Sequence, residues 1–564
     1  MFRVKKSLRV LIILGALFAP LVFVKADVLE QNRFFFVDKT FDGQDRSQVS
    51  TLLKVISENG YFYVESDWYN ALDTQRKANA DYGLQTLASE FDKVIYPQLS
   101  AIFGSEWKAG IDNDNRITIV FHRMKKGAAG YFRTQDESPQ IQAPDSNERE
   151  IIFLNADVLF SALAKSYLAH EFMHLVEYNQ KDRLRAVEEE VWLNEARADY
   201  APTLLGYNDT YKNSYLEQRS RGFVDNPRDP ITEWLNTEGD YGALNIFMHY
   251  FVERYGVGVL ADSLKSAKTG IASLDVSLKK YGFNKTFSQI FTDWTLAVYL
   301  NDCSLGPDYC FQRNDLKSLK VAPFLILAPA ASQVKSSLVY QEKPWAGYWY
   351  KVVGGGAKLI VKVSAQSGVA LQAPYILCAK DNACLVRFLE MGRDNQAELT
   401  FDNFNVDYSS LTLIPSIHSP VEDGEGFAPS FNVSFQLENP DNSELIEQLQ
   451  RQLAELQQKI AQLRAQLLRM TGGGQAACQA SSFEQIMKLG TAGEGVKCLQ
   501  TFLAKQGTDI YPEGVISGFY GVLTQKAVSR FQTKYANEIL APLGITNPTG
   551  VVGPATLAKI KQML

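Results

Sequence analysis

The stretch LAHEFMHLVEY, residues Leu168–Tyr178, contains two of the five histidines in this 564-residue chain, with a glutamate between them. It lies within KSYLAHEFMHLVEYN, a run without Gly or Pro that predicts a helix. Residues four apart lie on one face of a helix, one turn apart, so His170 and His174 should point the same way. Two imidazoles in that arrangement can bind one Zn²⁺, and Glu171 beside them can act on a water that the metal activates. The alternative interpretation is a structural helix that carries two half-buried histidines.

A second helical pattern follows in VEEEVWLNEARADYAPTLLGY and offers a third ligand. A carboxylate from Glu195 would complete a His₂Glu site and leave the fourth zinc position for water. Asn194 precedes that glutamate, and Asp199 follows it by one helical turn, where it could accept the remaining ring N–H of His170 and fix its tautomer. The acidic run at 188–190 is a competing source of ligands. However, none of its glutamates has an Asn directly before it and an Asp four residues after it.

Together, HEFMH and the downstream NEARAD resemble the zinc motifs of the gluzincins, the thermolysin-like zinc proteases. From roughly Phe34 to Tyr255 the order of segments is similar to that of the hyicolysin-type neutral metalloproteases: FDKVIYPQLSAIFG, DNDNRITIVF, GYF, SNEREIIFLN, HEFMH and WLNEARADY. This resemblance implies an α+β zincin-type catalytic domain that hydrolyses polypeptides with one Zn²⁺. Its site residues would be the ligands His170, His174 and Glu195, the general base Glu171, and Asp199 and Asn194 beside them.

The resemblance also predicts parts of the substrate cleft. IIFLN at 151–155 should be a strand before the zinc helix, where it would form the cleft rim and pair with extended substrate. An oxyanion donor is expected from a later helix, and Tyr241 in EGDYGALNIFMHYFVERYG is the candidate. A packed aromatic is the alternative interpretation of that tyrosine. His249 in the same run is the alternative donor, although a core histidine is its more usual interpretation.

The acidic stretch DNDN at 112–115 raises the question of a calcium loop. An EF-hand needs an oxygen acceptor at the position that Arg116 occupies, so that motif is excluded. A looser calcium-binding turn stays open.

The N-terminus has the three-part pattern of a secretory signal peptide at 1–26. Basic MFRVKKSLR precedes apolar VLIILGALFAPLVFV, and small residues lead to a cleavage site after Ala26. A retained membrane anchor is the alternative, but the apolar run is shorter than the ~20 residues of a spanning helix and Pro20 interrupts it. We therefore expect export to the cell surface or the medium.

Cysteine usage agrees with export. The six cysteines form three near pairs, and an even count in a secreted chain predicts disulfides. Local pairing is expected because each pair closes a short loop: Cys303 with Cys310, Cys378 with Cys384, and Cys478 with Cys498. A net charge of −6 provides no basic field for nucleic acid.

The length predicts several domains, and the character of the sequence changes along it. We expect the metallopeptidase domain at 27–320. From 321 to 439 come short β-branched and aromatic runs separated by turns, among them KLIVKVSA, PYILCA and SLTLIPSI. This spacing of strands favours a β-sandwich, in which the aromatic stretch WAGYWY would form core.

Residues 441–470 contain a strict heptad pattern. Apolar residues occupy one position at Ile446, Leu453, Ile460 and Leu467, and the other at Leu449, Leu456, Leu463 and Met470. An unbroken 3-4 spacing predicts a coiled coil and therefore a homo-oligomer, with a lone spacer helix as the alternative. The glycine-rich stretch at 471–477 should be a flexible linker.

The last segment, 478–564, joins Gly-rich turns to short amphipathic helices. Its pieces LQTFL, GFYG, TQKAVSRFQ and GVVGPAT closely resemble the peptidoglycan-binding domain of cell-wall enzymes, a small three-helix module. The resemblance implies that the protein binds peptidoglycan or another cell-wall polymer. A protein-contact role is the alternative.

These features predict a secreted, cell-wall-associated zinc endopeptidase. Two other functions stay open. One is a peptidase that cuts peptidoglycan cross-links, and the other is a wall-bound adhesin or scaffold without catalysis.

Overall fold

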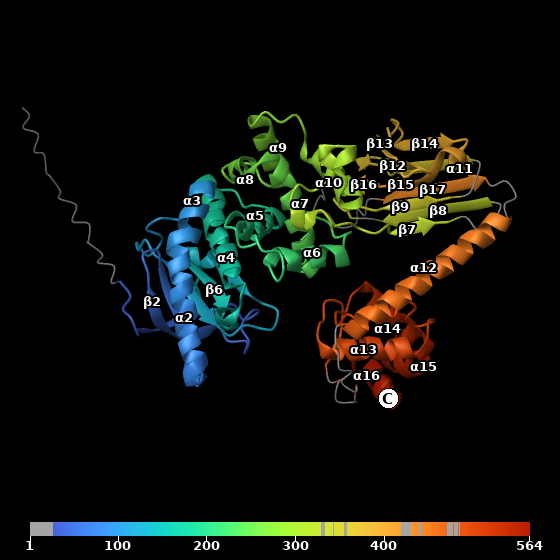
Figure 1. Ribbon diagram of the computed structural model, residues 1–564. Helices are drawn as coiled ribbons and strands as arrows, with labels where there is room; N and C mark the ends of the chain where they lie inside the picture. The colour runs from blue at the N-terminus through green and yellow to red at the C-terminus, as the bar shows by residue number, and fades with distance from the viewer. Residues whose placement is uncertain are drawn as a thin grey trace, which may run out of the picture. The chain divides into compact units, whose positions relative to one another are not determined.

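The computed structural model describes residues 26–328, 333–341, 343–354, 358–418, 430–438, 443–470, 478, 483 and 485–564 (Figure 1). The protein is multidomain and mixes helices with sheets. The predicted linker at 471–477 and, apart from Ala26, the predicted signal peptide lie outside the described residues. Within the described residues, no helix has the length and apolar character to cross a membrane.

The first part of the chain, up to Ala186, is built on a six-stranded sheet. The strand order is β1 (Asn32–Phe36), β2 (Gln48–Ile56), β3 (Gly60–Glu65), β4 (Ile117–His122), β6 (Ile151–Asn155) and β5 (Gly130–Phe132). The central strands β3, β4 and β6 are parallel, and every residue of β3 and β4 is buried. Strands covered on both faces need such continuous apolar sequence.

The place of β6 corrects one prediction. IIFLN does form the strand before the helix that carries His170 and His174, but it pairs with β4 on one side and with β5 on the other. The prediction that this strand pairs with substrate is therefore wrong, because both its edges are occupied. The edge strand of the sheet on this side is β5.

Four α-helices accompany this sheet: α1 (Ser66–Ala71), α2 (Thr74–Glu90), α3 (Tyr96–Phe103) and α4 (Ala164–Tyr178). Asp73 caps α2 by accepting a hydrogen bond from the Arg76 N–H at 2.8 Å. Phe172 of α4 packs against Phe91 and Tyr96, with ring centroids 5.2 Å and 5.4 Å away. Aromatic packing thus holds α4 against this layer.

From Val187 onward, the first elements are helices: α5 (Val191–Leu204), α6 (Tyr215–Asp225), α7 (Glu238–Tyr255), α8 (Val257–Leu264), α9 (Gly270–Lys280) and α10 (Phe287–Leu300). Thr237 and Asp240 form a capping box that starts α7. Helices α6 and α7 cross closely at Gly222 and Gly242. A Cβ on Gly242 would lie 2.3 Å from the Phe223 backbone nitrogen, so a larger residue would force the helices apart.

Among the described residues, a two-stranded antiparallel sheet, β11 (Leu371–Gln372) with β16 (Ser416–Ile417), and two larger sheets follow. One of the larger sheets is antiparallel and has the order β14 (Gln396–Phe401), β10 (Lys358–Ala365), β17 (Ser430–Glu438) and β8 (Gln333–Gln341). The other, which is antiparallel apart from its parallel β7–β9 pair, is β13 (Cys384–Phe388), β12 (Pro374–Ala379), β15 (Tyr408–Leu413), β9 (Tyr350–Val353) and β7 (Leu325–Leu327). Side chains of both larger sheets, such as Val361 and Leu411, share one hydrophobic core.

The aromatic stretch WAGYWY belongs only partly to that core. Tyr348 and Tyr350 lie in it, as predicted. Trp349 instead donates its indole N–H to the Thr295 carbonyl of α10 at 3.0 Å, and Trp345 packs on Phe291 of the same helix. Alternate residues therefore face the sheets and the helix, because side chains of an extended segment point to opposite sides.

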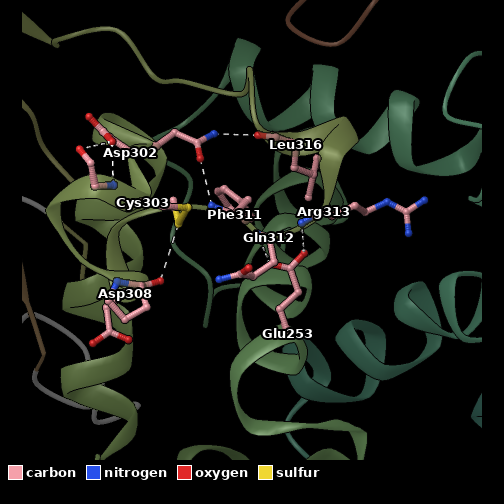
Figure 2. The surroundings of a disulfide bond; sticks show 12 residues. Glu253, Asp302, Cys303, Asp308, Phe311, Gln312, Arg313 and Leu316 are labelled. Atoms are coloured by element: carbon pink, nitrogen blue, oxygen red, sulfur yellow. Dashed lines mark hydrogen bonds between the residues drawn. A yellow bond between two sulfur atoms is a disulfide. The ribbon is translucent and has the colours of Figure 1, made fainter.

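All three predicted disulfides are confirmed: Cys303–Cys310, Cys378–Cys384 and Cys478–Cys498. The first closes a loop that follows α10, and Figure 2 shows its surroundings. Glu253 of α7 accepts the backbone N–H groups of Gln312 and Arg313 at 2.9 Å and 3.0 Å. These bonds tie the disulfide loop to α7.

The final elements are the 28-residue helix α12 (Ser443–Met470) and a small helical module. The module contains α13 (Glu494–Lys505), α14 (Val522–Lys534), α15 (Ala536–Ile539) and α16 (Pro554–Gln562). Three helices are expected from the sequence, and α15 is a short addition. Phe483, Leu499, Tyr520, Phe531 and Val552 are among its fully buried core residues.

Candidate metal centre

The candidate metal centre begins on α4, a helix embedded in the protein. Phe172 and Met173 are completely buried, while His170 and His174 retain 6% and 8% exposure. Their ring centroids lie 4.9 Å apart with an angle of 81° between the planes. The two imidazoles therefore lie next to each other on one helical face, as the i, i+4 spacing requires.

The third predicted ligand comes from α5. One potential ligand atom from each of His170, His174 and Glu195 lies within 4.8 Å of the other two. Both histidines are buried, and Glu195 is half-buried. Two imidazoles and one carboxylate are a donor set of catalytic zinc sites, so the residues present fit Zn²⁺.

Glu171 is 5% exposed and lies against the edge strand β5. A Cβ built on Gly130 would be 2.5 Å from Glu171 Oε1 and 2.7 Å from its Cδ and Cγ atoms. Glycine at position 130 therefore allows the strand to approach the predicted general base. GYF is one of the segments that carry the resemblance, but no pattern in the sequence singles out this glycine.

Asp199 is fully buried one helical turn after Glu195. Its Oδ1 accepts from the Tyr215 hydroxyl at 2.6 Å and from Arg219 Nε at 3.0 Å, and its Oδ2 accepts from Asn245 Nδ2 at 2.7 Å. These donors hold the carboxylate in one orientation. Its predicted bond to His170 stays a prediction.

Asn194 is half-buried on α5, next to Glu195. Its backbone N–H donates to the Glu190 carbonyl at 3.1 Å and so belongs to the first turn of the helix. Its predicted place beside the metal ligands stays a prediction.

Tyr241 is half-buried near the start of α7. The guanidinium of Arg219 lies 4.2 Å from its ring centroid, and the ring of Trp234 packs edge-on at 4.8 Å. Burial opposes the charge of Arg219, but Asp199 and two tyrosines raise its pKa, so it remains a cation. Arg219 therefore connects Tyr241 with Asp199, a link that no motif in the sequence indicates.

His249, the alternative oxyanion donor, is a core residue. It is 1% exposed, its Nε2 is 3.2 Å from Thr203 Oγ1, and its ring packs on Tyr200. Burial lowers its pKa to about 3, with a further contribution from Arg313. A neutral imidazole packed in this way agrees with the core interpretation.

The acidic run at 188–190 is largely committed to other contacts. Glu189 is buried and pairs with Arg197 at 2.9 Å, and its Oε1 accepts the Gly270 N–H. Glu190 accepts the indole N–H of Trp192. These partners explain why the run lies beside α5 without being part of the His–His–Glu group.

The C-terminal module contains two equivalent glutamine contacts. Gln500 Nε2 donates to Phe519 O at 2.8 Å, and its Oε1 accepts the Gly518 N–H at 2.8 Å. Gln532 makes the same pair of bonds with the next turn, to Val551 O at 2.8 Å and from the Gly550 N–H at 2.9 Å. Each glutamine fixes one Gly-containing turn, which gives the repeated LQ and FQ of the sequence a structural role.

Comparison with known protein families agrees with the prediction of a peptidoglycan-binding module. A family model described as "Putative peptidoglycan binding domain" matches residues 492–560. The chain therefore carries a C-terminal peptidoglycan-binding domain, which is consistent with export and association with the cell wall. No curated protein matches the chain.

Two solved structures resemble parts of the chain. The pre-peptidase C-terminal domain of a collagenase from Bacillus anthracis has 11% identity, 20% coverage of this chain, 96% coverage of that chain and a TM-score of 0.14. The lysozyme inhibitor PliG from Aeromonas hydrophila, a periplasmic inhibitor of g-type lysozyme, has 11% identity, coverages of 21% and 99% and the same TM-score.

Proposed function

We propose that this protein is a secreted, cell-wall-associated zinc endopeptidase of the gluzincin type. The observation that carries the proposal is the group formed by His170, His174 and Glu195, whose ligand atoms lie within 4.8 Å of one another. Glu171 projects from the same helix as the two histidines. This combination of side chains suits peptide hydrolysis by an activated water.

The three ligands would hold Zn²⁺, which when bound polarises the scissile carbonyl and lowers the pKa of a water toward ~7. Glu171 would take the proton of that water and later deliver it to the leaving amine. Gly130 keeps β5 close enough to limit the movement of this carboxylate. Asp199 would orient the site through the second ring nitrogen of His170.

Tyr241 is the proposed donor to the oxyanion of the tetrahedral intermediate. It is half-buried, and Arg219 and Trp234 hold its ring. A phenol fixed in this way can donate without reorganisation as negative charge develops on the substrate oxygen. The burial of His249 favours the tyrosine over the histidine for this role.

The edge strand β5 is the proposed binding strand for the substrate. It pairs with β6 on one side only in the sheet order, and its Gly130 contacts Glu171. An extended polypeptide that added to this edge would place its backbone beside the general base. Backbone pairing requires no particular side chain, which favours an endopeptidase with polypeptide substrates.

The rest of the chain would hold the enzyme on the cell wall. The peptidoglycan-binding domain matched at 492–560 supports retention on peptidoglycan. We interpret the two larger sheets after α10 as a β-sandwich spacer. We interpret α12 as a coiled coil that joins chains, and the segment 1–26 as a signal peptide that directs export.

The ligand assignment is tested by metal analysis of purified variants. His174→Ala and Glu195→Gln should each lose most bound zinc and hydrolysis of a soluble protein substrate. Glu188→Gln, an exposed neighbour in the acidic run, is the matched control and should retain both. Normal zinc content in His174→Ala would refute the assignment.

A second candidate function keeps the chemistry and changes the substrate to peptidoglycan cross-links. The peptidoglycan-binding domain favours it, because this domain would bring the enzyme to that polymer. Digestion of purified sacculi distinguishes the two functions. Loss of cross-linked muropeptides, without cleavage of polypeptides, would support the second one.

A further inference from the structure

A pair of buried glutamates lies outside the candidate metal centre, in the segment that joins β5 to β6. Glu137 and Glu150 are 4% and 2% exposed, and their carboxyl groups face each other within hydrogen-bonding reach. Among the described residues, no N–H or hydroxyl donates to either carboxyl oxygen of Glu137 or to Oε2 of Glu150. Glu150 Oε1 accepts the Ile111 N–H at 2.8 Å.

The chain is built closely around this pair. Gly110 has a positive φ of 57°, and a Cβ there would lie 1.5 Å from Glu150 Oε2. Only glycine fits a left-handed position that close to a carboxyl oxygen. The loop before β4 therefore wraps over the Glu150 carboxyl group, which keeps water from reaching it freely.

The surroundings of the pair are acidic. Asp112 and Asp136 add negative charge near Glu137, and Tyr178 of α4 is a further titratable group there. Arg149 Nε is 3.5 Å from Asp112 Oδ2, but its Nη1 is bonded to Asp27.

Arg133 is a second cation near these acids. Its Nε lies 3.5 Å from Asp136 Oδ2, and its Nη2 is shared with Asp145. Burial and then Glu150 raise the pKa of Glu137, and burial raises the pKa of Glu150 to about 7. A buried carboxylate pair needs either a shared proton or a cation.

We propose that Glu137 and Glu150 are ligands of a structural Ca²⁺, with the carboxylate of Asp112 as a nearby negative charge outside the ligand set. A single shared proton would join one oxygen of each carboxyl group and leave an oxygen of Glu137 without a partner. Ca²⁺ takes six to eight oxygen ligands at flexible geometry and accepts bidentate carboxylates, backbone carbonyls and water. The side-chain groups named here offer carboxylate oxygens, which suit Ca²⁺ better than Zn²⁺.

This site is independent of the proposed zinc chemistry but would support its scaffold. Glu137 is the last residue of the short 3₁₀ helix (Thr134–Glu137) that follows β5, and Glu150 directly precedes β6. A cation bound by both glutamates would hold the two ends of the connecting segment together. It would thereby fix the end of β5 and the start of β6. Because Gly130 of β5 contacts Glu171, calcium would also steady the strand beside the predicted general base.

The test is thermal unfolding of the full-length, zinc-loaded protein in calcium-free buffer with zinc retained. We use the Glu171→Gln background to prevent self-digestion. Saturating Ca²⁺ should raise the first unfolding midpoint by on the order of 5 °C, and Mg²⁺ should raise it far less. Glu137→Gln should abolish the calcium response, and Asp112→Asn should lower calcium affinity about tenfold. Glu148→Gln, the same substitution at a half-buried glutamate of the same segment, is the control that retains the response.

The dependence on pH separates calcium from a shared proton. The raised pKa values mean that the metal-free fold binds protons that the unfolded chain releases, so its stability should fall as pH rises from 6 to 8. Calcium must displace that proton, so its stabilisation should grow over the same range. Absence of any calcium response in the Glu171→Gln parent, or an unchanged response in both Glu137→Gln and Asp112→Asn, would overturn the proposal. Direct titration should find one Ca²⁺ per chain in the parent and none in Glu137→Gln.

Discussion

A methyl group on Gly130 would stand within 2.7 Å of three atoms of Glu171, so this glycine connects the edge strand with the predicted base. Gly130→Ala should displace the carboxylate and lower turnover by about tenfold or more, because misplacing a catalytic group by an ångström is costly. Zinc content should stay normal. Gly553→Ala, at a glycine with nothing within 4 Å, should leave hydrolysis of a soluble substrate unchanged. Wild-type turnover in Gly130→Ala would mean that the contact does not position Glu171.

Tyr241 is the expected hydrogen-bond donor to the oxyanion of the intermediate. Tyr241→Phe keeps the ring that packs on Arg219 and Trp234 but removes the hydroxyl. Turnover should fall by roughly 10²–10³-fold, the usual effect of removing one oxyanion donor, while KM changes little. Steady-state kinetics on a peptide substrate provides the measurement. If both constants stay at wild-type values, Tyr241 has only a packing role.

The sequence predicts which side chains lie next to each other where a short separation along the chain determines it. His170 and His174 share a helical face because they are four residues apart, and the local cysteine pairs form for a similar reason. The link between Arg219 and Tyr241 could not be predicted, since it depends on how α6 crosses α7. The buried pair Glu137–Glu150 was likewise invisible, because nothing in the sequence shows that both carboxyl groups turn inward.

At the scale of elements, α12 exposes an apolar stripe. Leu453, Leu456 and Leu463 are each 59% exposed on a helix whose predicted role is to join chains. Changing Leu456 and Leu463 to Gln should dissociate the oligomer, since each buried leucine contributes roughly 1.5–3 kcal/mol. The double change Gln458→Asn and Gln462→Asn lies off the stripe and should not. Sedimentation compares the two proteins, and a monomeric wild-type protein would show that α12 is only a spacer.

The disulfide Cys478–Cys498 ties the entry of the last module to α13. It closes a loop with a sequence separation of 20, so its loss should destabilise the module by about 3 kcal/mol in the chain-entropy model. We expect Cys478→Ser with Cys498→Ser to speed amide hydrogen exchange throughout α13 and α14. Exchange in the six-stranded sheet serves as the internal control. Unchanged exchange in both helices would show that the bridge adds no stability.

Elements with strong local signals were predicted well. KLIVKVSA and PYILCA coincide with β10 and β12, because alternating apolar residues specify a strand with one buried face. The order of strands in the first sheet was harder. The three-residue β5 is too short to show an alternation of apolar and polar residues. Its pairing with β6 is a long-range contact that the sequence does not reveal, so β6 was wrongly expected to be the edge strand.

At the scale of the whole molecule, the peptidoglycan-binding domain should control location and leave chemistry alone. Truncation before Ser443 removes α12 and the module. Hydrolysis of a small soluble substrate should stay within about twofold of wild type, and the protein should no longer pellet with isolated cell wall. The isolated module should bind wall weakly, and two modules on one stalk should bind about 10²–10⁴-fold better. Failure of the module to bind peptidoglycan would redirect the search to a protein partner.

The central claim is that Glu171 serves as the general base of a zinc peptidase. The most direct measurement compares wild type with Glu171→Gln for zinc content and turnover of the same soluble substrate. Both proteins should contain one zinc per chain, and turnover of the variant should fall by roughly 10²–10⁴-fold. Wild-type turnover in a zinc-loaded Glu171→Gln protein would contradict the account.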